Sequence, residues 1–487
     1  MNSMTGDFRP TGTKAHGRLI ALELNELCPH LLARWMAEGS LPNFKALHEQ
    51  SDVFVTRADV EEPALLEPWI QWYSVHTGLP YDQHRVFHLT EGKRGGHDDI
   101  FRLAMAAGRR VTSFASMNVA PFAREGSVFV GDPWSEDGDA SPAELNVYNR
   151  FVSHNVREYS NASDRMSAGD YAKFLAFMAR HGLSAATVKA IAAQLTGERL
   201  QDRQLAWKRV ALLDALQFDV FRSYYRALKP DFASFFANST AHLQHSYWRH
   251  MDPEPFTVRP DAAEMALYGD AVKFGYRAMD RLVGRFLKLA KAEGASLMFL
   301  TALSQQPFLR YEELGGQNFY RLHDVEAFLK RLGIPFEDVS PTMTHQYLAQ
   351  FGSPEAARAA RARLEGLRLE DGRAVFGFPA VDAEPGALYF GCQVSTRTPA
   401  ETPVTDGSQA RAFGDQAHAF GDLFYRIDAI KSGRHHPDGC LWIQTGRHRV
   451  HEAKPSILDV LPTQLDLLGV PAPEGLAGKS LARVLAA

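Results

Sequence analysis

The chain has 487 residues, of which 45% are hydrophobic and 23% are charged, and its formal net charge is -4. This length suffices for a large core with an inserted subdomain, and the composition is that of an ordinary globular protein. Because the net charge is not positive, the sequence does not indicate a nucleic-acid-binding surface.

The cysteines Cys28, Cys392 and Cys440 lie far apart in the chain. Such a sparse, odd set favours a reducing compartment over a disulfide framework. Residues 1–18 contain no apolar run typical of a signal peptide, and no run approaches the length that spans a bilayer. We therefore expect a cytoplasmic protein with no membrane partner.

Short apolar runs bounded by polar or small residues predict buried strands. They are LIALEL at 19–24, SVFV at 127–130, DFASFFAN at 231–238, SLMFLT at 296–301 and CLWIQT at 440–445. Helical patterns alternate with them. Residues 29–38 begin with a proline and end before Gly39, and residues 265–290 place apolar side chains at steps of three and four. The alternation predicts an α/β fold, a mostly parallel sheet with helices on both faces.

Two stretches interrupt this alternation. Residues 140–230 are almost entirely helical in pattern, and residues 309–395 mix a helix with polar loops. We predict that both are insertions forming a cap over one edge of the sheet. The core would then consist of residues 15–139, 231–308 and 396–487.

Polar residues follow or precede the predicted strands at the edge where open α/β sheets bind ligands. They are Glu23, Asn25, Glu26, His242, His245, Gln305, His435 and His436. His242 and His245 are three residues apart, so on a helix they share a face. Together with His435 they would bind a divalent ion through imidazole nitrogens. The alternative is that these histidines hydrogen-bond backbone groups or carboxylates around the site.

Four segments, in this order, resemble the alkaline phosphatase superfamily and its type I phosphodiesterase/nucleotide pyrophosphatase branch. They are LIALELNELCPHLLARWMAEGSLPNFKAL, EPWIQWYSVHTGLPYDQHRVF, FFANSTAHLQHSYWRHM, and GRHHPDGCLWIQTG followed by SILDVLPTQLDLLGVPAPEGLAGKSL. The resemblance covers residues 1–130, 231–307 and 428–487. It implies an alkaline-phosphatase-like sheet and a site with two metal ions and a hydroxyl nucleophile.

Most residues of that two-metal site are replaced. By this resemblance, His245 and His435 match ligand histidines. The positions where the family has its aspartates, another histidine and the nucleophile read Asn25, Pro68, Ala241, Ala302 and Leu303. These side chains do not balance the charge of two divalent ions, so we expect no two-metal centre.

Two other assignments were considered. Moving the first loop by one or two residues would bring Glu26 or Glu23 to the site. Ser74 and Thr77 are hydroxyl residues near the nucleophile position, but they fall in the helix after it. We expect them to be ordinary helix residues.

Glu67 precedes Pro68 and so stands at the nucleophile position. We hypothesise a hydrolase or transferase that acts, without the usual two-metal centre, on a phosphorylated, sulfated or glycosyl small molecule or glycan. Its catalytic residues would be Glu67, His245, His435 and Asn25. Its substrate-binding residues would be His242, His436, Gln305 and Trp69. Glu67 would otherwise form a salt bridge or lie at a helix N-terminus, and Trp69 would otherwise pack in the core.

Two other functions stay open. One is a mononuclear metal phosphoesterase that uses His245, His435, His242 and a nearby glutamate. The other is a non-catalytic binding protein that keeps the fold. The cofactor is accordingly one divalent ion or none, and the sequence leaves the oligomeric state open.

Overall fold

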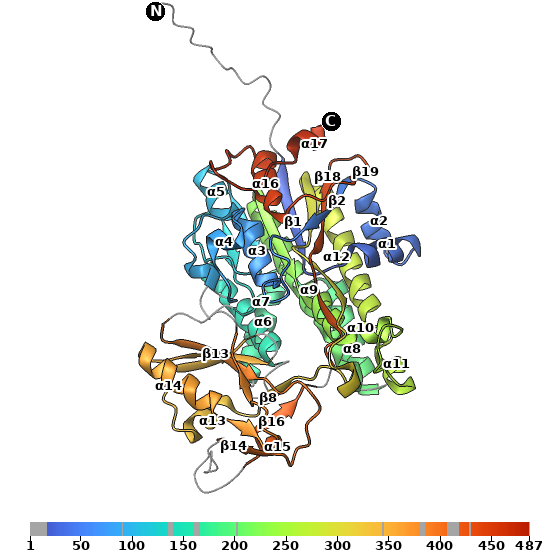
Figure 1. Cartoon of the computed structure of the whole chain (residues 1–487). Helices are drawn as coiled ribbons and strands as arrows, with labels where there is room; N and C mark the ends of the chain where they lie inside the picture. Colours follow the sequence, from blue (N-terminus) through green and yellow to red (C-terminus); the bar gives the residue numbers. More distant parts are fainter. Residues whose placement is uncertain are drawn as a thin grey trace, which may run out of the picture.

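The centre of the molecule is a twisted sheet with the strand order β19-β2-β18-β6-β1-β5-β3-β4 (Figure 1). The computed structural model describes residues 17–89, 91–134, 140–158, 166–200, 203–342, 345–379, 385–406, 418–427 and 430–486. The strands are β1 (Arg18–Leu24), β2 (Ser51–Arg57), β3 (Val111–Phe114), β4 (Val128–Val130), β5 (Phe232–Ala237), β6 (Ala295–Leu300), β18 (Asp438–Gln444) and β19 (Arg449–Val450). Strand β18 runs antiparallel to β2 and β6, and the other pairs are parallel. The predicted mostly parallel sheet is confirmed.

Helices cover both faces of this sheet because its central strand is apolar on both sides. Ile20, Leu22 and Leu24 of β1 join one hydrophobic core, and Leu19 and Ala21 join the other. The first core includes α1 (Pro29–Ala37), α2 (Pro42–His48), α9 (Val210–Leu228) and α12 (Ala271–Glu293). The second includes α3 (Pro68–Thr77), α5 (Ile100–Ala106) and α16 (Val460–Leu468). The remaining body helices are α4 (Tyr81–His84), α10 (Ser239–Met251), α11 (Ala262–Tyr268) and α17 (Ala482–Ala486).

The prediction of one helix over residues 265–290 is wrong, because the chain breaks between α11 and α12. The amide of Gly269 closes α11 by donating to the carbonyl oxygen of Met265, and Asp270 then occupies the N-cap position of α12. The apolar steps of three and four continue across the break, so the pattern alone does not reveal it.

The stretch 140–230 is helical but is not a cap. It forms α6 (Asn146–Glu158), α7 (Ala168–Arg180) and α8 (Ala185–Leu200) before α9. Phe151, Phe174 and Phe177 pack into the same core as α9 and α12. This segment therefore thickens one face of the sheet.

The second insertion forms a separate lobe with its own hydrophobic core, seen at the lower end of Figure 1. We call residues 309–430 the cap. Its helices are α13 (Val325–Arg331), α14 (Pro354–Glu365) and α15 (Phe420–Leu423). Its strands are β8 (Tyr320–Leu322), β9 (Asp338–Pro341), β10 (Gln346–Gln350), β11 (Arg368–Leu369), β12 (Phe376–Gly377), β13 (Ala387–Cys392), β14 (Pro403–Thr405), β15 (His418–Ala419) and β16 (Phe424–Arg426).

The predicted cap boundary at residue 395 is too early. Strand β14 pairs with β11, and β16 pairs with β8. Phe420 and Phe424 belong to the cap core. The return chain therefore completes the cap before it re-enters the body.

An antiparallel pair of strands, β7 (Ser304–Pro307) and β17 (Gly433–His436), joins the cap to the body. We call residues 304–308 and 431–436 the neck. Its register places His435 opposite Gln305, so two of the predicted site residues lie where the two lobes meet. None of the helices in the described part of the chain has the length and apolar character needed to cross a bilayer. A cytoplasmic location stays a prediction.

Candidate metal centre

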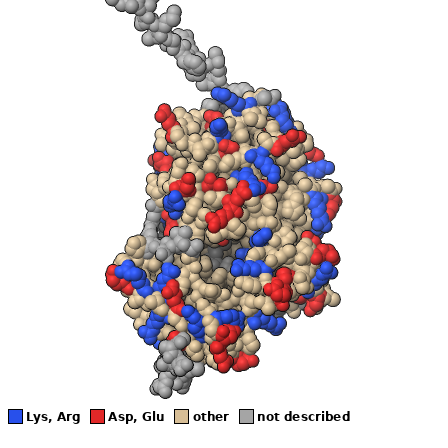
Figure 2. Space-filling view, viewed as in Figure 1, with Lys and Arg blue, Asp and Glu red and all other residues tan. Residues whose placement is uncertain are grey.

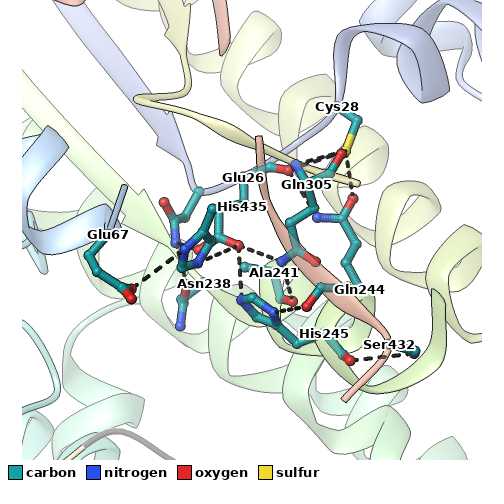
Figure 3. Close-up of polar contacts among 12 residues, drawn as sticks. Glu26, Cys28, Glu67, Asn238, Ala241, Gln244, His245, Gln305, Ser432 and His435 are labelled. Carbon is teal, nitrogen blue, oxygen red and sulfur yellow. Dashed lines mark hydrogen bonds and ion pairs between the residues drawn. The ribbon is translucent and has the colours of Figure 1, made fainter. Parts of the chain in front are cut away.

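Three side chains from distant segments converge where the neck meets the sheet (Figure 3). Glu26 lies in the turn after β1, His245 on α10 and His435 on β17. Oε2 of Glu26 lies 3.1 Å from Nε2 of His245 and 3.7 Å from Nε2 of His435. Ligand atoms of the three residues all lie within 4.8 Å of one another.

Both imidazoles direct Nε2 to the carboxylate of Glu26. Nδ1 of His245 lies 2.8 Å from the carbonyl oxygen of Gly433. A carbonyl only accepts hydrogen bonds, so Nδ1 carries a proton and Nε2 is the nitrogen that would bind a metal ion. His435 hydrogen-bonds the backbone of Leu66, and burial lowers the pKa of His435 to about 3. Such outer hydrogen bonds orient histidines that bind metals.

The carboxylate of Glu26 is ionised. Burial by itself would raise the pKa of Glu26, but His245, His435 and the hydrogen bond from Gln305 together lower it to about 2. Its backbone has φ of 63°, a left-handed conformation that non-glycine residues adopt mainly where surrounding structure holds them, often at functional sites.

The separations fit one divalent ion. Metal bonds of about 2.0–2.2 Å in a tetrahedral zinc site place neighbouring ligand atoms about 3.4 Å apart. The distances from Oε2 of Glu26 to Nε2 of His245 (3.1 Å) and to Nε2 of His435 (3.7 Å) lie on either side of this spacing. Two histidines and one carboxylate also leave a coordination position open, as in catalytic zinc sites.

Asn25 lies behind this centre and holds Glu26. Its Nδ2 donates to Oε1 of Glu26 and to Oδ1 of Asn238, both at 2.8 Å. Its Oδ1 accepts from Nε1 of Trp72 at 2.7 Å. Because Asn25 is only 1% exposed, the structure places it as a positioning residue instead of the predicted catalytic one.

Gln305 plays a similar part and is not placed to contact substrate. Its buried Nε2 donates to Oε2 of Glu26 and to the carbonyl oxygen of Ala241. Gly433 lies against it. A Cβ at residue 433 would come 2.3 Å from Oε1 of Gln305 and 2.6 Å from the backbone oxygen of Gln244. Only glycine fits there while its carbonyl holds His245.

Glu67 reaches the centre from the N-terminus of α3. Its Oε2 lies 3.5 Å from Nδ1 of His435, and its side chain is 27% exposed. It occupies the N-cap position but makes no capping hydrogen bond. Burial raises the pKa of Glu67 to about 7, while Lys431 opposes the rise and Glu26 adds to it.

Three other predicted residues lie outside the ligand set. Nδ1 of His436 accepts from the amide of Asp438 at 3.1 Å, and neighbouring side chains on a strand point to opposite faces. Nε1 of Trp69 donates to the carbonyl oxygen of Phe87 at 2.5 Å. His242 lies one helical turn before His245, and burial, with a smaller effect of His245, lowers its pKa to about 4.

Apolar packing occupies the positions where the resemblance led us to expect other metal ligands. Ala241, Ala302 and Leu303 are fully buried, and Leu303 packs against Ala58 and Leu66. Within the described ranges, Glu26, His245 and His435 form the one cluster of possible metal ligands.

Two charged residues near the centre were not assigned a role from the sequence. Glu26 was named among the polar residues at the strand ends and through a shift of the first loop, but not as a chosen site residue. Lys431 was not named, although it lies four residues before His435. Its charge interacts with those of Glu67 and Glu26.

Comparison with known proteins gives distant structural likenesses. No family model matches the sequence, and no curated protein does. The chain is similar in structure to the alkaline phosphatase PafA, with a TM-score of 0.46, 11% identity, and coverage of 96% of this chain and 98% of that one. It is also similar to the phosphonate monoester hydrolase of Silicibacter pomeroyi (TM-score 0.42, 12% identity, 96% and 76% covered). Murine ectonucleotide pyrophosphatase/phosphodiesterase 5 follows (TM-score 0.37, 9% identity, 96% and 99% covered).

These proteins belong to the alkaline phosphatase superfamily, which is the superfamily that the sequence motifs resemble.

Proposed function

We propose that the protein hydrolyses phosphoesters or closely related anionic esters with one divalent ion held by Glu26, His245 and His435. The observation that carries this proposal is the convergence of two imidazole nitrogens and one carboxylate oxygen within 4.8 Å. A divalent ion bound there would polarise a phosphoryl oxygen as a Lewis acid. Of the alternatives drawn from the sequence, this is the mononuclear phosphoesterase, with Glu26 as the glutamate ligand in place of His242.

The segments that resemble the alkaline phosphatase superfamily support the ester class. The charge on the molecular surface agrees with a small-molecule or glycan substrate, because Figure 2 shows basic and acidic side chains mixed over this face. A long polyanion is bound by a continuous basic surface instead.

Glu67 supplies the base in this proposal. A pKa of about 7 suits a group that accepts a proton at neutral pH. The oxygen of a water molecule bonds to phosphorus while Glu67 takes a proton from that water. The bond between phosphorus and the ester oxygen breaks, and the leaving oxygen takes a proton from solvent.

The test is hydrolysis of p-nitrophenyl phosphate, bis(p-nitrophenyl) phosphate and p-nitrophenyl sulfate by the metal-loaded protein. We expect turnover of at least one ester, a loss of rate after chelation, and recovery when a divalent metal is returned. Glu67→Gln should lower kcat about 10²–10⁴-fold, the usual contribution of a general base, and should keep the bound metal. Glu62→Gln, at an exposed glutamate nearby, is the matched control.

Two results would contradict the proposal. An unchanged rate after removal of all metal would favour the metal-free chemistry considered from the sequence. A Glu67→Gln variant as active as the unsubstituted protein would remove Glu67 from the reaction.

A further inference from the structure

Lys431 is held at a fixed place in the neck by three backbone hydrogen bonds. Its amide donates to the carbonyl oxygen of Gln317 in the cap at 3.1 Å. The amide of the next residue, Ser432, donates to the carbonyl oxygen of His245 at 2.8 Å, and Phe308 donates to that of Ser432 at 2.9 Å. The backbone of Lys431 is thereby tied to the cap on one side and to a candidate metal ligand on the other.

The charge of Lys431 interacts with those of Glu67 and Glu26 at the candidate metal centre. Lys431 lies two residues before the start of β17 and forms an isolated antiparallel bridge with Gln317. Its Nζ lies 5.6 Å from the ring centre of Phe308 and 5.8 Å from that of Phe319. The rings support the ammonium group through cation–π contacts.

The charges facing Lys431 are those of Glu67, Glu26 and Arg310. Among the described residues, no carboxylate oxygen lies within the 4.0 Å of an ion pair with Nζ. A half-buried ammonium without a carboxylate partner is unfavourable, and burial lowers the pKa of Lys431. The hydrogen-bond donors of the ammonium are therefore left for an anion in the site.

A site with one metal ion also has less positive charge than a site with two. In two-metal phosphoester hydrolysis, both ions stabilise the charge on the reacting group. Here Pro68, Ala302 and Leu303 stand where the resemblance places groups of that centre, and none of them holds a cation.

We infer that Lys431 binds the anionic group of the substrate and supplies the positive charge that a second metal ion would otherwise bring. The inference rests on the proposed function and narrows it. The substrate carries a phosphate or sulfate group, and a neutral glycoside is not the substrate.

The experiment measures the binding of inorganic phosphate, and separately of sulfate, to zinc-loaded protein by isothermal titration calorimetry. Lys431→Met keeps the length and the contacts of the stem but removes the charge. We expect it to weaken the binding of at least one anion about 10–100-fold, the range for a hydrogen bond to a charged group. Lys431→Arg should restore most of the affinity. Lys330→Met, at an exposed lysine of the cap, should bind like the unsubstituted protein.

Metal content and thermal unfolding of each variant separate the possible outcomes. Phosphate and sulfate affinities within twofold of the unsubstituted protein, with the metal retained, would overturn the role of Lys431 and leave the proposed function standing. Loss of the ion in Lys431→Met would also overturn it, because the lysine would then act through the metal site.

If the unsubstituted protein binds no ion, the proposed function fails. The anion titration of metal-free protein then still decides whether Lys431 is the anion-binding group. If Lys431→Met does not fold, Lys431→Gln replaces it under the same criteria.

Discussion

At the scale of single residues, Asn25 and Glu26 have different roles at the candidate metal centre. Glu26 supplies the carboxylate, and Asn25 holds that carboxylate in place. The amide of Asn25 brings no charge, yet it donates to Glu26 and Asn238 and accepts from Trp72. Glu26, turned by its left-handed backbone, brings the negative charge that the centre needs. An asparagine where the resemblance implies an aspartate is therefore compatible with the proposed metal site.

This division predicts that restoring an aspartate is harmful. Asn25→Asp would place a carboxylate against two oxygen acceptors, Oε1 of Glu26 and Oδ1 of Asn238, with no proton to share. We expect about 10–100-fold weaker metal binding, as when other groups that orient a ligand are lost. A zinc titration of the purified variant measures this.

Asn43→Asp is the control, because Asn43 also donates to a carboxylate, that of Asp280, far from the centre. It should lower thermal stability and leave zinc affinity unchanged. Equal zinc affinity in Asn25→Asp would show that Asn25 does not position Glu26.

His245 and His435 were named from the sequence because each lies next to a predicted strand end, and Glu67 was named because the resemblance places the nucleophile beside it. The sequence does not show in which direction neighbouring side chains point. His436 and His242 were therefore predicted as site residues together with His435 and His245. Glu26 was harder to predict, because a glutamate in a loop gives no sign of a left-handed φ. Lys431 lies in a stretch without a predicted element, so its face could not be assigned.

At the scale of elements, the hydroxyls considered as nucleophiles have structural roles in α3. Thr77 donates to the carbonyl oxygen of Tyr73 at 2.8 Å, and Ser74 hydrogen-bonds Nε2 of His84 at 3.0 Å. Nδ1 of His84 accepts from the amide of Val86 at 3.0 Å. The hydrogen bond between Ser74 and His84 connects α3 to α4. Glu67 lies at the N-cap of α3.

His84 makes this connection sensitive to acid. Burial, with smaller effects of His97 and Arg85, lowers the pKa of His84 from 6.5 to about 3. The unfolded chain takes up a proton below pH 6.5 and the folded chain does not, so stability is lost as the pH falls from 6.5 toward 3. At pH 5 this amounts to about 2 kcal/mol.

We expect His84→Gln to reduce the loss of unfolding free energy between pH 7 and pH 5 by about 1–2 kcal/mol, as measured by urea denaturation. His323→Gln, at an exposed histidine, should leave the loss unchanged. A pH dependence in His84→Gln identical to that of the unsubstituted protein would contradict the assignment.

The long apolar runs predicted the central strands because burial on both faces leaves an unmistakable pattern. Strands β2 and β3 were missed since SDVFVTR and VTSF mix polar residues into short runs. The break between α11 and α12 was missed because the apolar stripe continues through it. Periodicity reports which face is buried, and it does not report where a helix ends.

At the scale of the whole molecule, the candidate site lies at the seam between body and cap. The neck joins the two lobes, and the ring of His88 in the body stacks on Tyr389 of β13, with ring centres 3.9 Å apart. The hydroxyl of Tyr389 also donates to the carbonyl oxygen of Leu89 at 3.3 Å. The cap therefore also contacts the body away from the neck.

Because of this arrangement, both lobes contribute residues to the candidate site. Glu26, Glu67 and His245 come from the body, and Lys431 and His435 from the chain that returns from the cap. The place of the cap in the chain was predictable, but its end was not, since its last strands pair with partners about 35–100 residues earlier.

The central claim is that Glu26, His245 and His435 hold a single divalent ion. The most direct measurement is the metal content of the purified chain after loading with zinc and removal of unbound metal, determined by mass spectrometry. We predict one ion per chain in the unsubstituted protein and none after the combined substitution of His245→Ala and His435→Ala. No bound ion in the unsubstituted protein, or an ion retained by the doubly substituted one, would contradict the account.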